Sequence, residues 1–161
     1  MSAVSKQLLM AEVYRYFKDD PSLCLLIGDM GFAVLDDYLN NHPDRAFNIG
    51  IAEQGAMGIA AGMALSGMTP LYYSQIPFLI MRAFEQIRYD ICEHQLNVKL
   101  IGVGAENFFH RLGRSHCVDE DDLKILSIFP DLLILAPTEE SVARDVAKMF
   151  AYQGPVYVRC R

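Results

Sequence analysis

The sequence predicts an α/β fold with about six strands in a mostly parallel sheet and helices on both faces. Short apolar runs alternate with longer stretches of helical periodicity along the whole chain, which is typical of parallel strands joined by crossover helices. No linker, low-complexity tract or internal repeat interrupts this alternation. These elements would use all of residues 1–161, so a single domain is expected.

The first half of the chain is expected to supply three strands. Apolar residues at helical spacing predict a first helix, which Asp19-Asp20-Pro21 would end, and a buried strand follows. The turn after that strand holds Asp29, and open α/β sheets usually bind ligands at this end of a strand. Helices are predicted over residues 2–17, 33–41 and 53–66, and strands over 23–27, 46–49 and 69–74.

The second half repeats the same unit with one long connection. The loop over residues 104–118 is longer than the usual connection of about 2 to 6 residues, and long ordered loops are often functional. Helices are predicted over residues 78–95, 119–127 and 139–151, and strands over 99–103, 132–135 and 156–158.

Composition excludes several classes of function. The 14 Lys and Arg against 20 Asp and Glu give a net charge of −6, which disfavours nucleic acid and anionic membranes as partners. Apolar runs are far shorter than the roughly 20 residues that span a bilayer, and no signal peptide opens the chain, so a soluble, cytoplasmic protein is expected. The 4 cysteines form no C-x-x-C pair, which indicates reduced structural thiols and no metal site.

The predicted helix over residues 53–66 is unusually rich in glycine. Gly55, Gly58 and Gly62 lie inside it, and each interior glycine costs about 0.8–1 kcal/mol relative to alanine. Small residues are useful where another backbone approaches closely. Two explanations remain open, which are packing against the underlying sheet and packing against a partner helix across a subunit interface.

Glu53 opens this helix among small and apolar residues. A carboxylate at a helix start can simply serve the free N–H groups of the first turn. Because its neighbours are apolar, Glu53 is instead expected to be buried, and burial without a cation would favour the protonated carboxyl form. A carboxyl group in that state can exchange a proton with a ring nitrogen.

Several segments together resemble the pyrimidine-binding domain of transketolase-like, thiamine diphosphate-dependent enzymes. The match begins with RAFNIGIAEQ at residues 45–54 and GIAAGMA at residues 58–64. It continues in the family's order over almost the whole chain, through RAFEQIR at residues 82–88, GVGA at 102–105, LGRSH at 112–116 and EDD at 120–122. The end of that domain is matched by FPD at residues 129–131, APT at 136–138 and GPVYVR at 154–159.

The resemblance implies a cofactor role for four residues. Glu53 would hydrogen-bond N1′ of the aminopyrimidine and promote removal of the thiazolium C2 proton. Phe78, and less strongly Phe84, would pack on the pyrimidine ring, although both could equally be ordinary core aromatics. Asp29 would touch cofactor or substrate, with a turn-forming role as the commoner explanation.

The resemblance also implies a substrate role for the long loop. His116 matches a histidine that faces the reacting substrate and could donate a hydrogen bond or move a proton, unless it is a solvated surface histidine. Ser115, Arg114 and Arg111 are candidate substrate-binding residues beside it. The two arginines depart from the family's usual acidic residue and proline, and they could bind a substrate anion or a partner chain.

Part of the family's active site has no counterpart in this sequence. The family holds the diphosphate through Mg²⁺ with a G-D-G motif and a downstream Asn, and Gly28-Asp29-Met30 does not match that motif. The resemblance therefore implies a split enzyme, in which a separate subunit holds the diphosphate and Mg²⁺, in a dimer of heterodimers. An excised domain of a longer polypeptide is the other possibility.

The resulting expectation is the pyrimidine-binding subunit of an enzyme that transfers a two-carbon ketol unit between sugar substrates. A deoxyxylulose-phosphate synthase-like or 2-oxo acid dehydrogenase-like reaction is the alternative within the enzyme class. Outside it, a noncatalytic interaction module with the same fold is the rival, and the apolar setting of Glu53 speaks against that rival.

Overall fold

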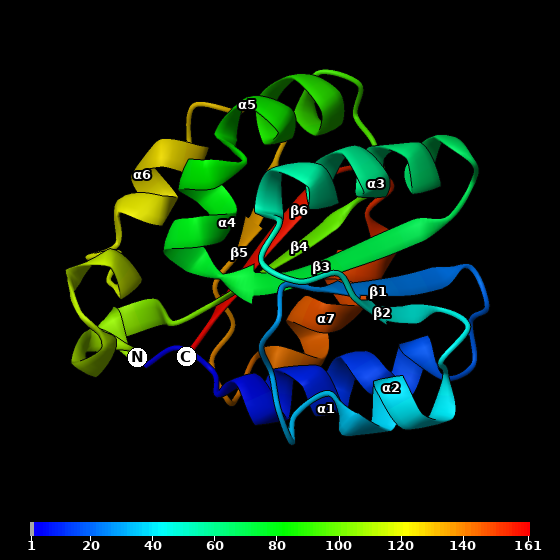
Figure 1. Cartoon of the computed structure of the whole chain (residues 1–161), viewed down its shortest axis with the longest axis horizontal. Helices are drawn as coiled ribbons and strands as arrows, with labels where there is room; N and C mark the ends of the chain where they lie inside the picture. Colours follow the sequence, from blue (N-terminus) through cyan, green and yellow to red (C-terminus); the bar gives the residue numbers. More distant parts are fainter. Residues whose placement is uncertain (1) are drawn as a thin grey trace.

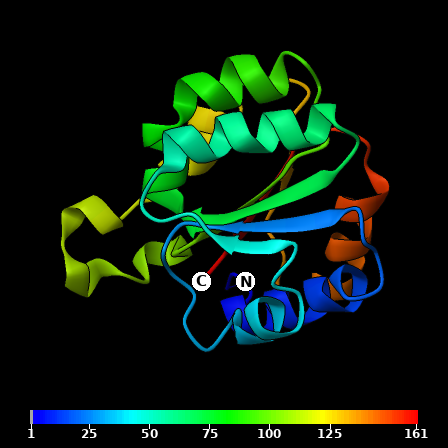
Figure 2. The same cartoon turned by 45° about the vertical axis from the view of Figure 1, so that its right-hand side comes forward.

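Six parallel strands form the central layer of the structure, a computed structural model that describes residues 2–161 (Figures 1 and 2). Met1, the first residue of the predicted domain, lies outside the described residues. Every pair of neighbouring strands is parallel, and the order is β2-β1-β3-β4-β6-β5, so the predicted α/β sheet is confirmed. The strands are β1 (Leu23–Ile27), β2 (Ala46–Asn48), β3 (Thr69–Gln75), β4 (Lys99–Val103), β5 (Leu133–Leu135) and β6 (Val156–Cys160).

Helices cover both faces of this sheet (Figure 1). One face carries α1 (Lys6–Phe17), α2 (Asp36–Asn41) and α7 (Val142–Ala151). The opposite face carries α3 (Glu53–Leu65), α4 (Ile76–Arg82), α5 (Phe84–Gln86), the π-helical segment η1 (Ile87–Cys92) and α6 (Asp121–Leu126). Within residues 2–161, no helix combines the length and the apolar character needed to cross a bilayer.

Two apolar cores lie on either side of the sheet. Leu25 and Ile27 of β1 enter one core and Leu26 enters the other, because successive side chains of a strand point to opposite faces. Both faces are therefore buried, which explains why the strands appear in the sequence as continuous apolar runs. The four cysteines are free thiols, as expected, and three of them are buried.

Several helices start later than their periodicity indicates, because the preceding residues leave helical geometry. Ser5 caps α1 by accepting a hydrogen bond from the Leu8 amide at 3.3 Å, so the helix begins at Lys6. Ala33 has a φ of 62°, which delays α2, and Glu120 with a φ of 64° delays α6 in the same way. Apolar spacing identifies the buried face of a helix, but it does not show that a residue at the helix start has a left-handed backbone conformation.

The predicted continuous helix over residues 78–95 is wrong in its bounds, since the helical residues run from Ile76 to Cys92, and in its continuity. It begins two residues earlier, at Ile76, with Pro77 in the first turn where a missing N–H costs nothing. It is then interrupted at the fully buried Ala83, whose φ of −110° and ψ of 19° lie outside the helical region. The break separates α4 from α5 and allows the two segments to run in different directions (Figure 1).

The long loop after β4 is ordered by side-chain contacts. It contains three short 3₁₀ turns, η2 (Ala105–Asn107), η3 (His110–Leu112) and η4 (Arg114–His116). The Asn107 side-chain oxygen accepts hydrogen bonds from the amides of Val118 and Asp119 at 3.0 and 3.1 Å, which closes the loop. Glu106 accepts a 2.7 Å hydrogen bond from the Ala3 amide and so attaches the loop to the N-terminal segment.

The glycines of α3 point away from the sheet. A Cβ built on Gly55, Gly58 or Gly62 would meet no other atom within 4 Å. The sheet-facing side of α3 is occupied instead by alanines and Met57, which are buried. Of the two explanations for this glycine-rich helix, packing against the sheet is therefore wrong.

Lys99 is a fully buried cation at the start of β4. Its ammonium group donates hydrogen bonds to the carbonyl oxygens of Tyr152 and Gly154 at 2.7 and 3.0 Å, at the end of α7. Burial lowers the pKa of Lys99 from its ordinary value of 10.5 to about 8. Below that pH the folded state must hold a charge in an apolar setting, which costs stability.

We expect the free energy of unfolding of the wild type to rise between pH 8 and pH 10, relative to Lys99→Met. The folded state releases the Lys99 proton near pH 8 and the unfolded state only near 10.5, so the unfolded state binds more protons in this window. The difference should reach on the order of 1–3 kcal/mol. Urea unfolding of both proteins measures it, and other alkaline groups cancel because they titrate in both. Parallel pH profiles would contradict the assignment.

Candidate functional site

A cavity of about 340 Å³ opens at the carboxyl ends of β1 and β3. The turn after β1 contributes one wall, the end of β3 the floor, and the first residue of α3 a second wall. α4 and the turn η4 complete it, so five separate segments meet at one edge of the sheet. The lining residues are Gly28, Asp29, Met30, Ile51, Glu53, Ser74, Gln75, Phe78, Arg82, Ser115 and His116.

The floor of the cavity depends on a close approach between β1 and β3. Ile27 lies opposite Tyr73, and the Gly28 amide donates a 3.0 Å hydrogen bond to the Tyr73 carbonyl. A Cβ on Gly28 would lie 2.9 Å from the Tyr72 hydroxyl and 3.0 Å from Ser74 Oγ, so only glycine fits without a shift. Burial raises the pKa of Tyr72 to about 12, and its hydroxyl therefore remains neutral beneath the cavity.

Glu53 is buried, as the sequence predicts, but it has a cationic partner. Only 4% of the residue is exposed, and its Oε1 accepts a 3.0 Å charged hydrogen bond from Arg82. The expectation of a carboxyl group without a cation is therefore wrong. The ion pair arises because α4 runs beside α3, a contact between residues 29 positions apart that no local pattern reveals.

Arg82, Phe78 and His116 form a continuous row along the cavity wall. The Arg82 guanidinium carbon lies 3.8 Å from the centre of the Phe78 ring, a cation–π contact. The rings of Phe78 and His116 meet edge to face, with centroids 5.0 Å apart. Ser115 Oγ lies 3.1 Å from His116 Nδ1. The loop histidine is thus held against an aromatic wall next to the buried carboxylate.

Asp29 lies at the cavity in a left-handed conformation, with a φ of 51°. Its carboxylate accepts a 3.0 Å hydrogen bond from the Asn48 side chain, and the Asn48 oxygen accepts from the amides of Asp29 and Gly50 at 3.2 and 3.0 Å. These contacts connect the ends of β1 and β2. Asp29 therefore combines the turn-forming role with a position at the cavity.

Three polar residues of the cavity were not predicted, namely Ser74, Gln75 and Arg82. Gln75 is 9% exposed, and its side-chain oxygen is buried without a hydrogen-bond partner in the described chain. Gln75 could have been identified from its position at the end of a strand, because parallel α/β sheets bind ligands at that edge. Arg82 follows Phe78 by four residues, so both lie on one face of a helix, and this spacing could have identified it.

Other predicted residues lie away from the cavity. The Phe84 ring packs on Phe129, with centroids 5.4 Å apart, on the far side of the break at Ala83. Arg114 forms an ion pair with Asp119, and Arg111 is exposed on η3. The structure therefore unites Glu53, Asp29, Phe78, Ser115 and His116 in the cavity, and does not bring Phe84, Arg111 or Arg114 to its lining.

Comparison with known proteins identifies relatives of this fold and site. Residues 3–161 match the family model for the transketolase pyrimidine-binding domain. The chain is 37% identical to an apulose-4-phosphate transketolase subunit of Actinobacillus succinogenes, over 79% of this chain and 41% of that protein. It is also 37% identical to a putative transketolase C-terminal section of Methanocaldococcus jannaschii, over 76% and 39%. The chain thus spans about two-fifths of these relatives' length.

Solved structures give the same result for the fold. A protein described as a split-gene transketolase, inactive beta4 tetramer, superposes with a TM-score of 0.82 at 30% identity, over 99% of this chain and 52% of that chain. A transketolase from Pichia stipitis reaches 0.81 at 11% identity over 99% and 25%, which supports the fold alone. The parallel sheet, the cavity at its carboxyl edge and the family match over residues 3–161 lead to one conclusion. The chain belongs to the transketolase pyrimidine-binding domain family.

Proposed function

We propose that this chain is the pyrimidine-binding half of a thiamine diphosphate-dependent transketolase that transfers a two-carbon ketol unit between sugar substrates. The observation that carries the proposal is a buried carboxylate, Glu53, in a cavity with an aromatic wall and a histidine. The names of the relatives, a transketolase subunit and a transketolase C-terminal section, support the same function.

The residues of the cavity fit an aminopyrimidine ring. Such a ring is flat and carries N–H groups, and the cavity offers the carboxylate of Glu53 and the unpartnered oxygen of Gln75 as acceptors. Phe78 supplies a ring against which the pyrimidine can pack. When bound, thiamine diphosphate supplies the carbon centre that attacks a substrate carbonyl and stores the resulting charge.

This chain contributes proton transfer and placement. With an aminopyrimidine bound, Glu53 would hold a proton between its carboxyl group and a ring nitrogen, donating to the neutral ring or accepting from the protonated one, in place of the hydrogen bond from Arg82. Arg82 also lies against the Phe78 ring, so its cation would remain near Glu53 and limit the cost of a buried charge. His116, held by Phe78, donates a hydrogen bond or a proton to the oxygen of the substrate carbonyl.

A separate chain holds the diphosphate and Mg²⁺ in this proposal. The outer face of α3 is a suitable packing surface, because Gly55, Gly58 and Gly62 leave room for another backbone. Ile59 and Leu65 on the same helix are 48% and 72% exposed, which adds apolar area to that face. We propose a dimer of heterodimers in the cytoplasm, acting in carbohydrate metabolism.

The substrate is proposed to be a sugar phosphate. Arg111 lies on the exposed loop that also carries Ser115 and His116, where its cation could bind a phosphate group beyond the cavity lining, and Arg114 could do so on leaving its ion pair with Asp119. A deoxyxylulose-phosphate synthase-like reaction remains the second candidate. It is favoured by 34% identity to 1-deoxy-D-xylulose-5-phosphate synthase of Bacillus velezensis, over 78% of this chain and 20% of that protein. Assays with a ketose and with a 2-oxo acid donor separate the two.

Glu53→Gln should lower the turnover of the assembled enzyme by at least about 100-fold, since general acid–base groups contribute roughly 10²–10⁴. The glutamine amide keeps the shape of the glutamate side chain, but it cannot take up and release a proton as the carboxyl group does. Steady-state kinetics with saturating cofactor measures the effect, and circular dichroism checks the fold. Glu85→Gln, an exposed residue of α5, is the matched control and should be unchanged. An unaltered rate in Glu53→Gln would remove the proposed role.

Phe78→Leu should weaken cofactor binding by about three- to tenfold, because the aromatic contact is lost. Phe84→Leu should leave cofactor affinity unchanged and lower the free energy of unfolding by about 1 kcal/mol, because Phe84 packs on Phe129. Titration of the assembled enzyme with thiamine diphosphate, paired with thermal unfolding, compares the two variants. Equal losses of affinity would contradict the distinction.

The isolated chain should bind thiamine diphosphate and Mg²⁺ weakly, because it lacks the residues that hold the diphosphate. Adding a partner chain with a G-D-G motif and a downstream Asn should restore binding. Isothermal titration calorimetry on each chain and on the mixture is the measurement. Tight one-to-one binding by the isolated chain would refute the split arrangement.

A further inference from the structure

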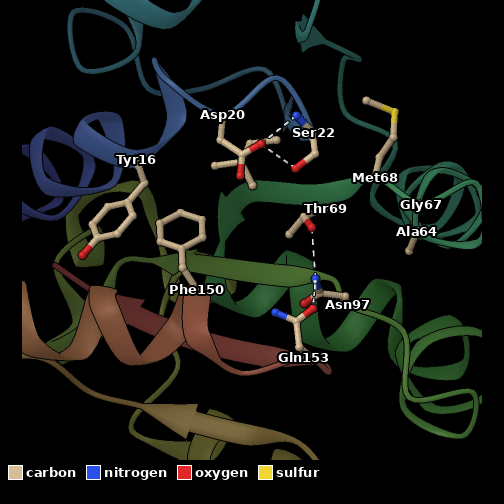
Figure 3. A pocket seen from close by; sticks show the side chains of 11 residues that line it. Tyr16, Asp20, Ser22, Ala64, Gly67, Met68, Thr69, Asn97, Phe150 and Gln153 are labelled. Carbon is tan, nitrogen blue, oxygen red and sulfur yellow. Dashed lines mark hydrogen bonds between the residues drawn. The ribbon is translucent and has the colours of Figure 1, made fainter.

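A second cavity of about 480 Å³ lies at the opposite edge of the sheet, where β1 and β3 begin (Figure 3). Asp20 and Ser22 approach it from the segment before β1, and Thr69 opens β3 beside them. Figure 3 shows helices closing it with Tyr16 of α1 and Phe150 of α7. The Glu53 cavity lies at the carboxyl ends of the same strands, so the two cavities share no lining residue.

One wall of this second cavity is a row of uncharged polar side chains. Asn97 donates hydrogen bonds to Thr69 Oγ1 at 3.0 Å and to Gln153 Oε1 at 3.4 Å. These contacts orient the Asn97 amide, yet its oxygen is buried without a partner among the described residues. A buried acceptor of this kind is costly unless a donor reaches it. Gln153, which is exposed, is the residue through which this wall can contact a ligand.

Asp20 adds a charged acceptor on the other side. Its Oδ1 accepts hydrogen bonds from the Ser22 amide at 2.9 Å and from Ser22 Oγ at 2.6 Å, which fixes the carboxylate. Within residues 2–161, no donor is bonded to the second oxygen, Oδ2. The lining contains no Lys, Arg or His, and the nearby Arg45 guanidinium is directed at the backbone carbonyls of Asp20 and Leu23. The Asp20 carboxylate would therefore repel a phosphate or carboxylate ligand.

The remaining wall is aromatic. Tyr16 and Phe150 stack with ring centroids 4.8 Å apart and an angle of 25° between their planes. Tyr16 is 37% exposed, so part of this pair is available to a ligand. Aliphatic C–H groups pack well on such a surface while hydroxyl groups turn toward the polar walls.

We propose that this cavity binds a small neutral polyhydroxy molecule, such as a pentitol or an uncharged sugar. The Asp20 carboxylate accepts from its hydroxyl groups, the Gln153 amide donates to them, and the Tyr16–Phe150 pair covers its carbon chain. A volume of about 480 Å³ lies within the usual range of roughly 300–1,000 Å³ for small-molecule sites.

Titration of the ¹⁵N-labelled chain with ribitol tests the proposal by nuclear magnetic resonance. Saturable shifts are expected at the amides of Ser22, Gly67 and Gln153, with the amides of Ser115 and His116 unaffected. Asp20→Asn should weaken ribitol binding by roughly tenfold, since a hydrogen bond to a charged acceptor is lost. The matched control is Asp19→Asn, an exposed neighbour outside the cavity, and it should bind like the wild type. Gln153→Ala, at an exposed position, is a second variant expected to weaken binding.

Several results would overturn the proposal. One is the absence of saturable shifts up to roughly 50 mM ribitol, beyond the range of specific weak binding. Another is equal affinity in Asp20→Asn and the wild type. Tighter binding of ribitol 5-phosphate would contradict a neutral ligand, and shifts from ethanolamine without shifts from ribitol would indicate a cation site instead. None of these readouts involves thiamine diphosphate or turnover, so the outcome is independent of the proposed catalytic function.

Discussion

Parallel pairing between β1 and β3 is the constraint on which the candidate site depends. Because both strands run in the same direction at the centre of the sheet, they end together, and the turn after Ile27 meets the end of β3. Gly28 makes that approach possible, since any larger side chain would collide with Tyr72 or Ser74. Helices bury both faces of the sheet, so a ligand that contacts the strands does so at their ends.

Electrostatic balance is the second requirement at this edge. A carboxylate removed from water costs several kcal/mol unless a cation compensates it. The side chain of Arg82 is 46% exposed and contacts both Glu53 and the Phe78 ring, so one side chain compensates the carboxylate and covers the aromatic wall. His116 completes the row from a different segment. The site therefore joins α3, α4 and the loop after β4 through three side-chain contacts.

Much of the fold and part of the site were predictable from local pattern. Strand positions follow from apolar runs that are buried on both faces, and the burial of Glu53 follows from its apolar neighbours. Helix ends were less accurate, because residues such as Ala33 and Glu120 adopt left-handed conformations that periodicity does not report. The single break at Ala83 had the largest consequence, since it directs the helix face of Phe84 away from the cavity.

Local sequence was sufficient for the parallel α/β architecture, for the family and for the burial of Glu53, because periodicity, strand-end position and short motifs are properties of neighbouring residues. Packing between distant segments determined the rest. This packing brings Arg82 to Glu53 and places Phe78, and not Phe84, in the cavity wall. It also leaves the glycines of α3 facing outward and forms the second cavity beside Asp20. These features depend on how helices lie against one another, and residues far apart in the chain meet only after that packing is complete.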